Sequence, residues 1–211
     1  MRAEVEAKFL ADAPAALTAL ATTATLGFAS LGPARTVTES DRYVDTADGA
    51  LAARHWACRL RRRDGVFRVS LKGPAEATFG AWHHRRPEVE GPATDSLDPA
   101  DWPDSDARRR LLDLAGRAEL VERFELRQER TERLVLVDGE PIGTMSLDIV
   151  DVVDGDRERG RLLVVELELA REGSLSANGL RVLADALAAR PGLRPDPRTK
   201  LEHALERLAD R

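Results

Sequence analysis

The sequence has little cysteine and no long apolar run. Its 211 residues include one cysteine, Cys58, which excludes an intrachain disulfide and a zinc site built from several thiolates. A single cysteine is typical of proteins in reducing compartments. No stretch approaches the roughly 20 apolar residues that span a membrane, and the first residues lack the apolar core of a signal peptide. We therefore expect a cytoplasmic protein without a membrane partner.

The charge balance is acidic, and this limits the kinds of partner. Lys and Arg together number 32 against 37 Asp and Glu, a net charge of −5. This argues against a broad basic face for a nucleic-acid backbone and leaves only local basic clusters, so we expect no nucleic-acid partner. The chain also lacks the pattern Gly-x-x-x-x-Gly-Lys-Ser/Thr, which excludes a conventional P-loop nucleotide hydrolase. Its length fits one sizeable core and predicts a single domain over residues 1–211.

Lysine is scarce although basic residues are common. Only Lys8, Lys72 and Lys200 are lysines, leaving 29 arginines. A bias this strong should have replaced any lysine whose role a guanidinium could fill. The alternative is chance, which three residues do not exclude. We interpret the three positions as sites that need a compact ammonium group.

Charged and apolar residues alternate with period two along most of the chain, which predicts β-strands with one charged face. Asp-Gly pairs at 64–65 and 138–139 predict hairpins, and Asp12 is a candidate N-cap for the first of four short helices. The pattern predicts an α+β fold, an eight-stranded antiparallel β-barrel with helices covering an apolar outer face. The expected strands are 4–9, 36–45, 55–63, 66–72, 80–90, 120–137, 142–153 and 161–169, and the expected helices are 12–24, 105–116, 176–189 and 197–209.

Acidic residues recur as pairs on the same strand face, such as Glu4 with Glu6 and Glu166 with Glu168. For a single strand, the simplest interpretation is a sheet face in water with cross-strand ion pairs. For the set, the repulsion within each pair favours a cation between the carboxylates, either an arginine or a divalent metal. A barrel would place these charges in a polar lumen. Carboxylates suit Mg²⁺ or Mn²⁺, and basic side chains suit phosphates.

Together these motifs resemble the CYTH domain superfamily, also called the triphosphate tunnel metalloenzymes. The most specific motif is Glu-x-Glu-x-Lys at Glu4, Glu6 and Lys8, and all three lysines fall on family positions. The resemblance extends from residue 4 to about 205. The other motifs, in family order, are Tyr43-Val44-Asp45-Thr46, Arg59-Leu60-Arg61, Leu71-Lys72-Gly73-Pro74, Arg86-Pro87-Glu88-Val89-Glu90, Leu147-Asp148, Glu166-Leu167-Glu168 and Thr199-Lys200-Leu201.

The resemblance implies a tunnel whose inward side chains bind a triphosphate and one or two Mg²⁺ or Mn²⁺ ions. The segment 127–133 admits more than one register, which leaves the assignment of Arg130 open. The implied metal ligands are Glu4, Glu6, Asp148, Glu166 and Glu168. The implied substrate-binding residues are Lys8, Arg59, Arg61, Lys72, Arg86, Glu88, Glu90, Arg130 and Lys200. The implied catalytic residues are Glu4, Glu6, Glu168 and Lys8.

The resemblance also implies the reaction, which is metal-dependent hydrolysis of a triphosphate-bearing small molecule. We expect inorganic tripolyphosphate as the substrate, with pyrophosphate and phosphate as products. Adenylate cyclase and thiamine triphosphatase activities are the alternatives within the family. Trp56, Trp82 and Trp102 are candidate platforms for an organic group, although packing at the rim or in the core is the favoured interpretation of all three. From another class, the chain could be a non-catalytic module that binds polyphosphate or nucleotide. Either a monomer or a homodimer is compatible with the sequence.

Overall fold

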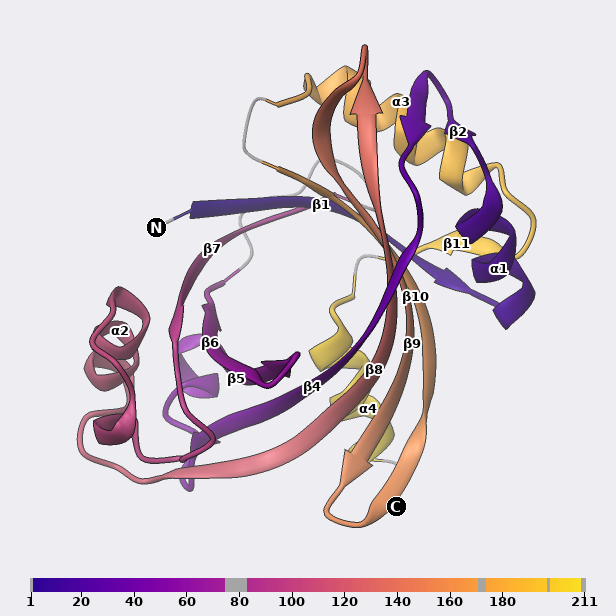
Figure 1. Cartoon of the computed structure of the whole chain (residues 1–211). Coiled ribbons are helices and arrows are strands. Elements are labelled where there is room, and N and C mark those ends of the chain that lie inside the picture. Colours follow the sequence, from indigo (N-terminus) through magenta and orange to yellow (C-terminus); the bar gives the residue numbers. More distant parts are fainter. Residues whose placement is uncertain (1, 75–82, 171–173, 197, 210–211) are drawn as a thin grey trace.

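Eleven strands and four α-helices make up the part of the chain that the structure describes (Figure 1). The computed structural model describes residues 2–74, 83–170, 174–196 and 198–209, without the side chains of 2–4, 83–85 and 177. The strands are β1 (Arg2–Ala11), β2 (Thr25–Leu26), β3 (Ala29–Leu31), β4 (Arg35–Thr46), β5 (Ala57–Arg63), β6 (Val66–Lys72), β7 (His83–Pro92), β8 (Leu120–Val137), β9 (Glu140–Asp154), β10 (Arg157–Leu169) and β11 (Leu193–Pro195). The helices are α1 (Pro14–Thr22), α2 (Asp106–Ala115), α3 (Ala177–Ala188) and α4 (Lys200–Ala209), with short 3-10 helices η1 (Ala52–Arg54) and η2 (Pro99–Asp101).

All strand pairings are antiparallel, and each of the eight long strands pairs with two other long strands. Their order is β8-β4-β5-β6-β7-β1-β10-β9, and β9 pairs with β8 again. The pairing is uneven, because β7 pairs with β6 over residues 88–92 and with β1 over residues 83–88. The sheet is therefore not closed along its whole length as an ideal barrel would be.

The predicted α+β class and antiparallel architecture are confirmed, and so is the number of helices and long strands. Three short strands were missed. The segment 27–33, expected to be an irregular connection, contributes β3, which pairs with β2 and with β8. The segment between the last two helices contributes β11, which pairs with β1.

Local sequence explains the hairpins and one helix start. Asp64 and Gly65 have φ values of 51° and 76°, as a tight turn between twisted strands requires. Ser105 caps α2 by accepting a hydrogen bond from the backbone N–H of Arg108. The expectation for Asp12 was wrong, because the N-cap of α1 is Ala13, which makes no side-chain cap. Pro14 does occupy the first turn, where its missing N–H costs nothing.

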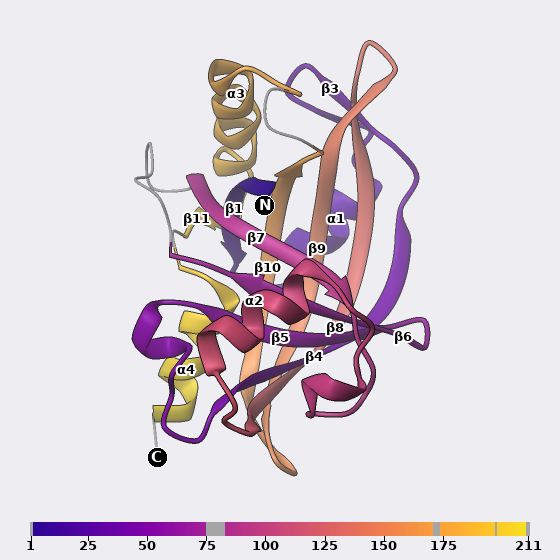
Figure 2. The same ribbon diagram turned by 90° about the vertical axis from the view of Figure 1, so that its left-hand side faces the viewer.

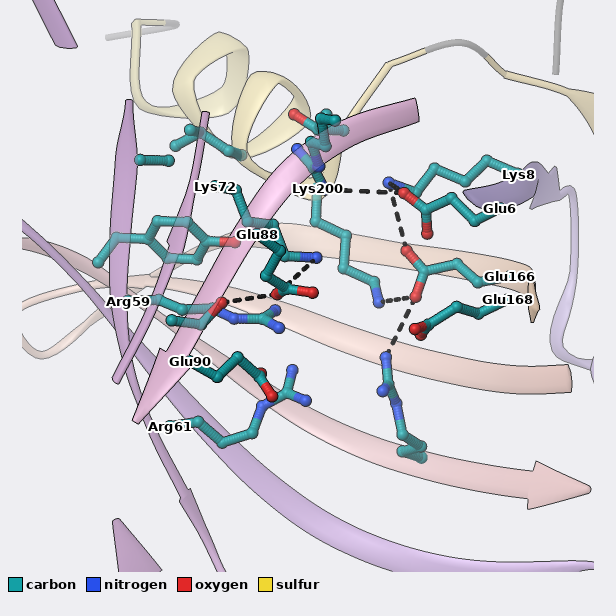
Figure 3. A pocket seen from close by; sticks show the side chains of 17 residues that line it. Glu6, Lys8, Arg59, Arg61, Lys72, Glu88, Glu90, Glu166, Glu168 and Lys200 are labelled. Atoms are coloured by element: carbon teal, nitrogen blue, oxygen red, sulfur yellow. Dashed lines mark hydrogen bonds and ion pairs between the residues drawn. The ribbon is translucent and has the colours of Figure 1, made fainter. Parts of the chain in front are cut away.

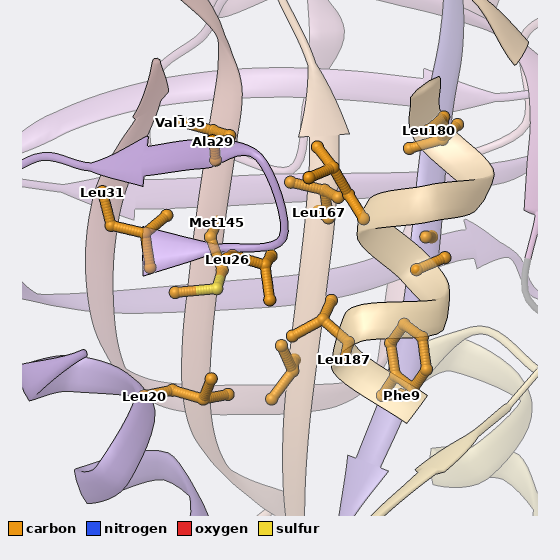
Figure 4. Close-up of a cluster of buried hydrophobic side chains, with 14 of the residues drawn as sticks. Phe9, Leu20, Leu26, Ala29, Leu31, Val135, Met145, Leu167, Leu180 and Leu187 are labelled. Carbon is orange, nitrogen blue, oxygen red and sulfur yellow. The ribbon is translucent and has the colours of Figure 1, made fainter. Parts of the chain in front are cut away.

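The largest core cluster lies between the outer face of the sheet and the helices α1 and α3. Strands β1, β9 and β10 contribute Phe9, Met145 and Leu167, all 0% exposed, and α1 and α3 contribute Leu20 and Leu187 (Figure 4). These strand residues have the opposite parity to Lys8, Asp148 and Glu166. Because the apolar side chains of these strands point outward, the charged side chains of the same strands point inward.

A second cluster lies under α2, which contacts β6 and β7 from outside (Figure 2). Helix α4 departs from expectation, since it packs on the inner face of the sheet at one end. Its Ala204 and Leu201 cluster with Leu126, Val150 and Val164, which share parity with the charged residues farther along their strands. In Figure 1, α4 lies inside the curve of the sheet. The expectation that all four helices cover the outer face was wrong, because the inner face becomes apolar at this end.

No helix in the described part of the chain is long and apolar enough to cross a membrane.

Candidate active site

A cavity of about 190 Å³ lies inside the curved sheet, next to the start of α4 (Figure 3). We call it the central cavity. Strands β1, β4, β5, β6, β7, β8 and β10 contribute to it, together with the residues at the start of α4. Its lining residues are Glu6, Lys8, Tyr43, Ala57, Arg59, Arg61, Ser70, Lys72, Arg86, Glu88, Glu90, Arg130, Glu166, Glu168, Thr199, Lys200 and Leu201.

All three lysines line the central cavity, although they lie 64 and 128 residues apart in sequence. Lys8 is on β1, Lys72 ends β6 and Lys200 begins α4. The three positions that the sequence analysis interpreted as needing an ammonium group therefore lie around one cavity. Arg130, whose register was open, also lines the cavity.

The cavity arginines of β5 are held by a buried carboxylate that the sequence analysis missed. Asp41 on β4 is 0% exposed and accepts hydrogen bonds from Nε of Arg61 at 2.7 Å and Nη1 of Arg59 at 3.2 Å. Gln128 donates to the same carboxylate at 2.8 Å. Burial acts to raise the pKa of Asp41, but Arg61 and Arg59 outweigh it and lower that pKa far below its usual value. The two guanidinium groups are thus aimed by a permanently ionised partner.

A second missed carboxylate, Glu39, lies two residues before Asp41 on the same face. Its oxygens are 3.3 Å from Arg61, 3.1 Å from Arg63 and 3.8 Å from Arg130. The signal that could have found Glu39 and Asp41 is the one used for Glu4 and Glu6, namely two acidic residues of one parity within a predicted strand. Strand β4 therefore supplies two buried carboxylates that contact the arginines of β5.

The carboxylates of β1 and β10 face two lysines. Nζ of Lys8 is 2.8 Å from Oε1 of Glu6 and 3.6 Å from Oε1 of Glu166. Nζ of Lys200 is 2.7 Å from Oε2 of Glu166 (Figure 3). Burial acts to raise the pKa of Glu166, but Lys200, Lys8 and Arg130 lower it well below its usual value. Glu166 is therefore ionised and shared between cations.

Asp148, expected as a metal ligand, lies behind these groups. It is 0% exposed and does not line the cavity. One oxygen accepts from Nε of Arg130 at 2.8 Å, and the other accepts from Nη2 of Arg130 at 2.8 Å and from Lys200 at 2.6 Å. In this arrangement both of its oxygens serve to place Arg130 and Lys200.

Strands β6 and β7 form the opposite wall. Glu88 accepts from Ser70 at 2.7 Å and lies 3.4 Å from Nζ of Lys72 (Figure 3). Nη2 of Arg86 is 3.7 Å from Glu6, which connects this wall to β1. Glu90 also lines the cavity. Alternate residues of β7, one basic and two acidic, thus line the same cavity.

The central cavity also contains carboxylates that could bind a divalent metal. Glu6 and Glu168 are direct register partners across β1 and β10, and both line the cavity. Like charges placed opposite each other are destabilising unless a cation lies between them, and carboxylate oxygens suit Mg²⁺ or Mn²⁺. Glu4 precedes Glu6 on the same strand face, but its side chain lies outside the described part. Within the described side chains, no group of three or more His, Cys, Asp or Glu is arranged to hold a metal. The carboxylates of Glu6 and Glu168 are therefore chemically suited to bind a divalent ion.

Two further cavities share walls with the central one. A cavity of about 360 Å³ shares Lys72 and Arg86 and is also lined by His55, Trp56 and Pro74. Another, of about 320 Å³, shares Arg59 and Arg61 and is also lined by Arg63 and Arg68. The two cavities therefore adjoin the central cavity at different walls.

Of the two described tryptophans that were considered as platforms, Trp56 lines one of these cavities and Trp102 does not. The ring of Trp56 lies 4.9 Å from the guanidinium of Arg110. Trp102 is 3% exposed, and its indole N–H donates to the carbonyl of Ser96, so it packs in the core beneath α2. Trp82 lies outside the described residues.

Comparison with protein families identifies this arrangement. The family model for the CYTH domain matches residues 2–205, nearly the whole chain. The chain belongs to the CYTH domain family. No curated protein sequence matches this CYTH chain.

Solved structures show the same CYTH fold at low sequence identity. The Hippeastrum protein HpAC1, an adenylyl cyclase candidate described as having a dominant triphosphatase activity, is 20% identical with a TM-score of 0.68, covering 96% of this chain and 95% of its own. An adenylate cyclase candidate from Bacillus halodurans is 17% identical with a TM-score of 0.63, covering 96% and 98%. The PH1819 protein from Pyrococcus horikoshii is 17% identical with a TM-score of 0.54, covering 95% and 98%. At these identities the likeness shows a shared fold and nothing more.

Proposed function

We propose that this CYTH protein hydrolyses a triphosphate with the help of a divalent metal, and that inorganic tripolyphosphate is its substrate. The observation that carries the proposal is the central cavity, where lysines and arginines from separate strands and from α4 surround one space beside opposed carboxylates. Such a space fits a compact, highly charged anion bound together with a cation. The description of HpAC1 as having a dominant triphosphatase activity supports the choice of reaction.

The basic residues would bind and orient the phosphate oxygens. Arg59 and Arg61 offer planar guanidinium groups fixed by Asp41, which suits two-point contacts with phosphate. Lys8, Lys72 and Lys200 offer ammonium groups from three sides. Each lysine lies within 3.4 Å of a carboxylate oxygen. A substrate would therefore bind among cations that are already placed, and little reorganisation would be needed.

Glu6 and Glu168, with Glu4 on the same strand, would hold the metal. When bound, such an ion supplies positive charge to phosphoryl oxygens and lowers the pKa of a bound water. The protein's own part is positioning. Lys8 and Lys200 would hold a phosphoryl group against the carboxylate end of the cavity while the arginines of β5 hold the rest of the chain. Water then adds to a terminal phosphorus, the phosphoanhydride bond breaks, and pyrophosphate and phosphate leave.

A triphosphate that carries an organic group is the second candidate. The cavity lined by Trp56 and Pro74 adjoins the central one through Lys72 and Arg86, so a ring attached to a bound triphosphate would have an aromatic surface beside it. Nucleoside triphosphates, including cyclase substrates, and thiamine triphosphate belong to this class.

The test is phosphate release from tripolyphosphate, ATP and thiamine triphosphate, each with Mg²⁺, Mn²⁺ or EDTA. We expect metal-dependent release that is fastest from tripolyphosphate. A preference for ATP or thiamine triphosphate would instead favour the organic class, and cyclic nucleotide formation would identify a cyclase. If tripolyphosphate binds in calorimetry but nothing is hydrolysed with either metal, the enzyme proposal is wrong and the binding module is right.

A further inference from the structure

A buried aspartate and histidine lie paired just outside the central cavity. Oδ2 of Asp196 and Nε2 of His203 are 2.6 Å apart, and each side chain is 4% exposed. Neither residue lines the cavity. Burial lowers the pKa of His203 below its usual value, although Asp196 opposes this. Burial acts to raise the pKa of Asp196, but the backbone N–H of Arg198 and the contact with His203 lower it. The ionised carboxylate can only accept, so His203 donates its Nε2–H to it.

The pair joins the two sides of Lys200, because Asp196 lies before this lysine in the sequence and His203 lies after it. Asp196 precedes α4, Lys200 begins it, and His203 lies three residues further on. The second oxygen of Asp196 accepts from the backbone N–H of Arg198 at 2.9 Å. The backbone N–H of His203 donates to the carbonyl of Thr199 at 3.1 Å. The side-chain pair thus fastens the first turn of α4 to the residues that lead into it.

The same segment is fastened to β1 at Lys8. The backbone N–H of Asp196 donates to the carbonyl oxygen of Lys8 at 3.1 Å. From their two backbones, Lys8 and Lys200 reach the two oxygens of one carboxylate, Glu166, at 3.6 and 2.7 Å. Asp196 therefore connects the backbone of Lys8 to the residues that lead into Lys200.

We propose that the Asp196–His203 pair is a positioning device that sets where the ammonium groups of Lys200 and Lys8 lie in the central cavity. A lysine side chain is long and flexible, so its charge is aimed only if its backbone is fixed. Thr199 and Glu202 cap the first turn of α4, with the N–H of Thr199 donating to Glu202 at 2.6 Å and the N–H of Glu202 donating to Oγ1 of Thr199 at 3.1 Å. Ala204 packs the body of the helix on the inner face. The pair adds the connection from this helix to Asp196 and, through its backbone, to β1. The kinetic consequence rests on the proposed function, whereas the placement of the lysines does not.

The chain offers a direct readout, because it has only three lysines. Protein labelled with ¹³C at the lysine Cε gives three side-chain NMR signals, which single Lys→Arg variants assign. We expect His203→Leu, which removes the donor, to shift the signals of Lys200 and Lys8 and to leave Lys72 unchanged. His203→Gln, whose amide can still donate, should stay close to the unaltered protein. Lys72, on β6, is the internal reference.

Kinetics supply the second readout. A misplaced ammonium group weakens its charge-assisted contact with a phosphate, so we expect His203→Leu to raise the KM for tripolyphosphate about tenfold. In a Lys200→Met background the same change should add less than about twofold, because the lysine that it positions is absent. His203→Gln should rescue KM.

Unchanged lysine signals and an unchanged KM in His203→Leu, with only a lower Tm, would overturn the proposal and leave a purely structural helix cap. An effect on KM that is undiminished in the Lys200→Met background would overturn it as well. If His203→Leu does not fold, Asp196→Asn is the second variant, since its single acceptor oxygen cannot serve both His203 and Arg198. Failure of the protein to hydrolyse tripolyphosphate would overturn the proposed function, while the lysine signals would still decide the positioning role.

Discussion

Glu6 on β1 and Glu168 on β10 are direct register partners, so two carboxylates face each other across neighbouring strands at the wall of the central cavity. Opposed like charges lower the stability of a sheet unless a cation lies between them. Lys8 already neutralises Glu6 at 2.8 Å. In the proposed function, a divalent ion bound beside Glu168 would add to the charge of Lys8 and so explain why two carboxylates are opposed here.

Glu168→Gln tests this explanation. The variant keeps the shape of the side chain but removes one of the opposed charges. We expect kcat for tripolyphosphate to fall at least about a hundredfold, while the Kd for tripolyphosphate changes less than about threefold. Mg²⁺ should raise the Tm of the unaltered protein and have little effect on the variant, because only a bound ion stabilises the folded state. Steady-state kinetics, calorimetry and thermal unfolding are the measurements.

Glu158→Gln is the matched control, because Glu158 is an exposed glutamate on the same strand. It should leave kcat and the Mg²⁺-dependent rise in Tm unchanged. Equal losses of turnover and binding in Glu168→Gln would contradict a metal-binding role for this carboxylate.

Asp41→Asn should strongly destabilise the protein. It leaves Arg59 and Arg61 without their shared buried anion, and breaking a buried ion pair on one side costs about 3–5 kcal/mol. Urea unfolding measures the loss. The matched control is Asp151→Asn, which breaks a bidentate contact with the exposed Arg161 and should cause a change within experimental error. Equal losses in the two variants would show that burial does not set the strength of the Asp41 contacts.

The thiol of Cys58 should be inert in the folded protein. Cys58 is 2% exposed, and burial, with a smaller contribution from Asp45, raises the pKa of the thiol above its usual value. We expect no reaction with a disulfide reagent in native buffer and one equivalent after unfolding in urea. Rapid native labelling, or loss of activity on labelling, would contradict the buried placement.

The sequence predicted the framework well because the framework depends on local patterns. Period-two alternation and the Asp-Gly turns at 64–65 and 138–139 determine which residues of each strand share a face. The scarcity of lysine then pointed to Lys8, Lys72 and Lys200, which do line one cavity. These inferences needed no knowledge of how the strands are placed relative to one another.

The remaining features depend on contacts between distant segments. Asp41 acquires its role only when β5 pairs with β4 and brings Arg59 and Arg61 beside it. The inward position of α4 depends on three neighbouring strands all becoming apolar at the same end. Asp196 and His203 gave no sequence signal, since their pairing depends on how the start of α4 meets β1.

Lys200→Met should change the acid sensitivity of the fold. Burial acts to raise the pKa of Glu166, but Lys200, followed by Lys8 and Arg130, lowers it well below 4.5. A carboxylate with a lowered pKa stabilises the fold fully above the pKa of the unfolded chain and progressively less as the pH falls toward its folded pKa. Removing Lys200 takes away the largest lowering contribution. The free energy of unfolding should therefore differ most between the two proteins above pH 4.5, and the difference should shrink between pH 4.5 and 3.

Urea unfolding at pH 7, 5, 4 and 3 measures this difference. Arg161→Gln is the control, because that exposed arginine pairs with Asp151 at the surface and should give a difference near zero at every pH. A difference for Lys200→Met that stays constant from pH 7 to 3 would mean that Lys200 stabilises the fold by packing alone. A difference that shrinks on acidification assigns the stabilisation to its charge, acting on Glu166 and on Asp148, whose pKa Arg130 and then Lys200 also lower against the effect of burial. The charge of Lys200 would then stabilise the fold through Glu166 and Asp148. The same ammonium group would contact a phosphate of the bound substrate.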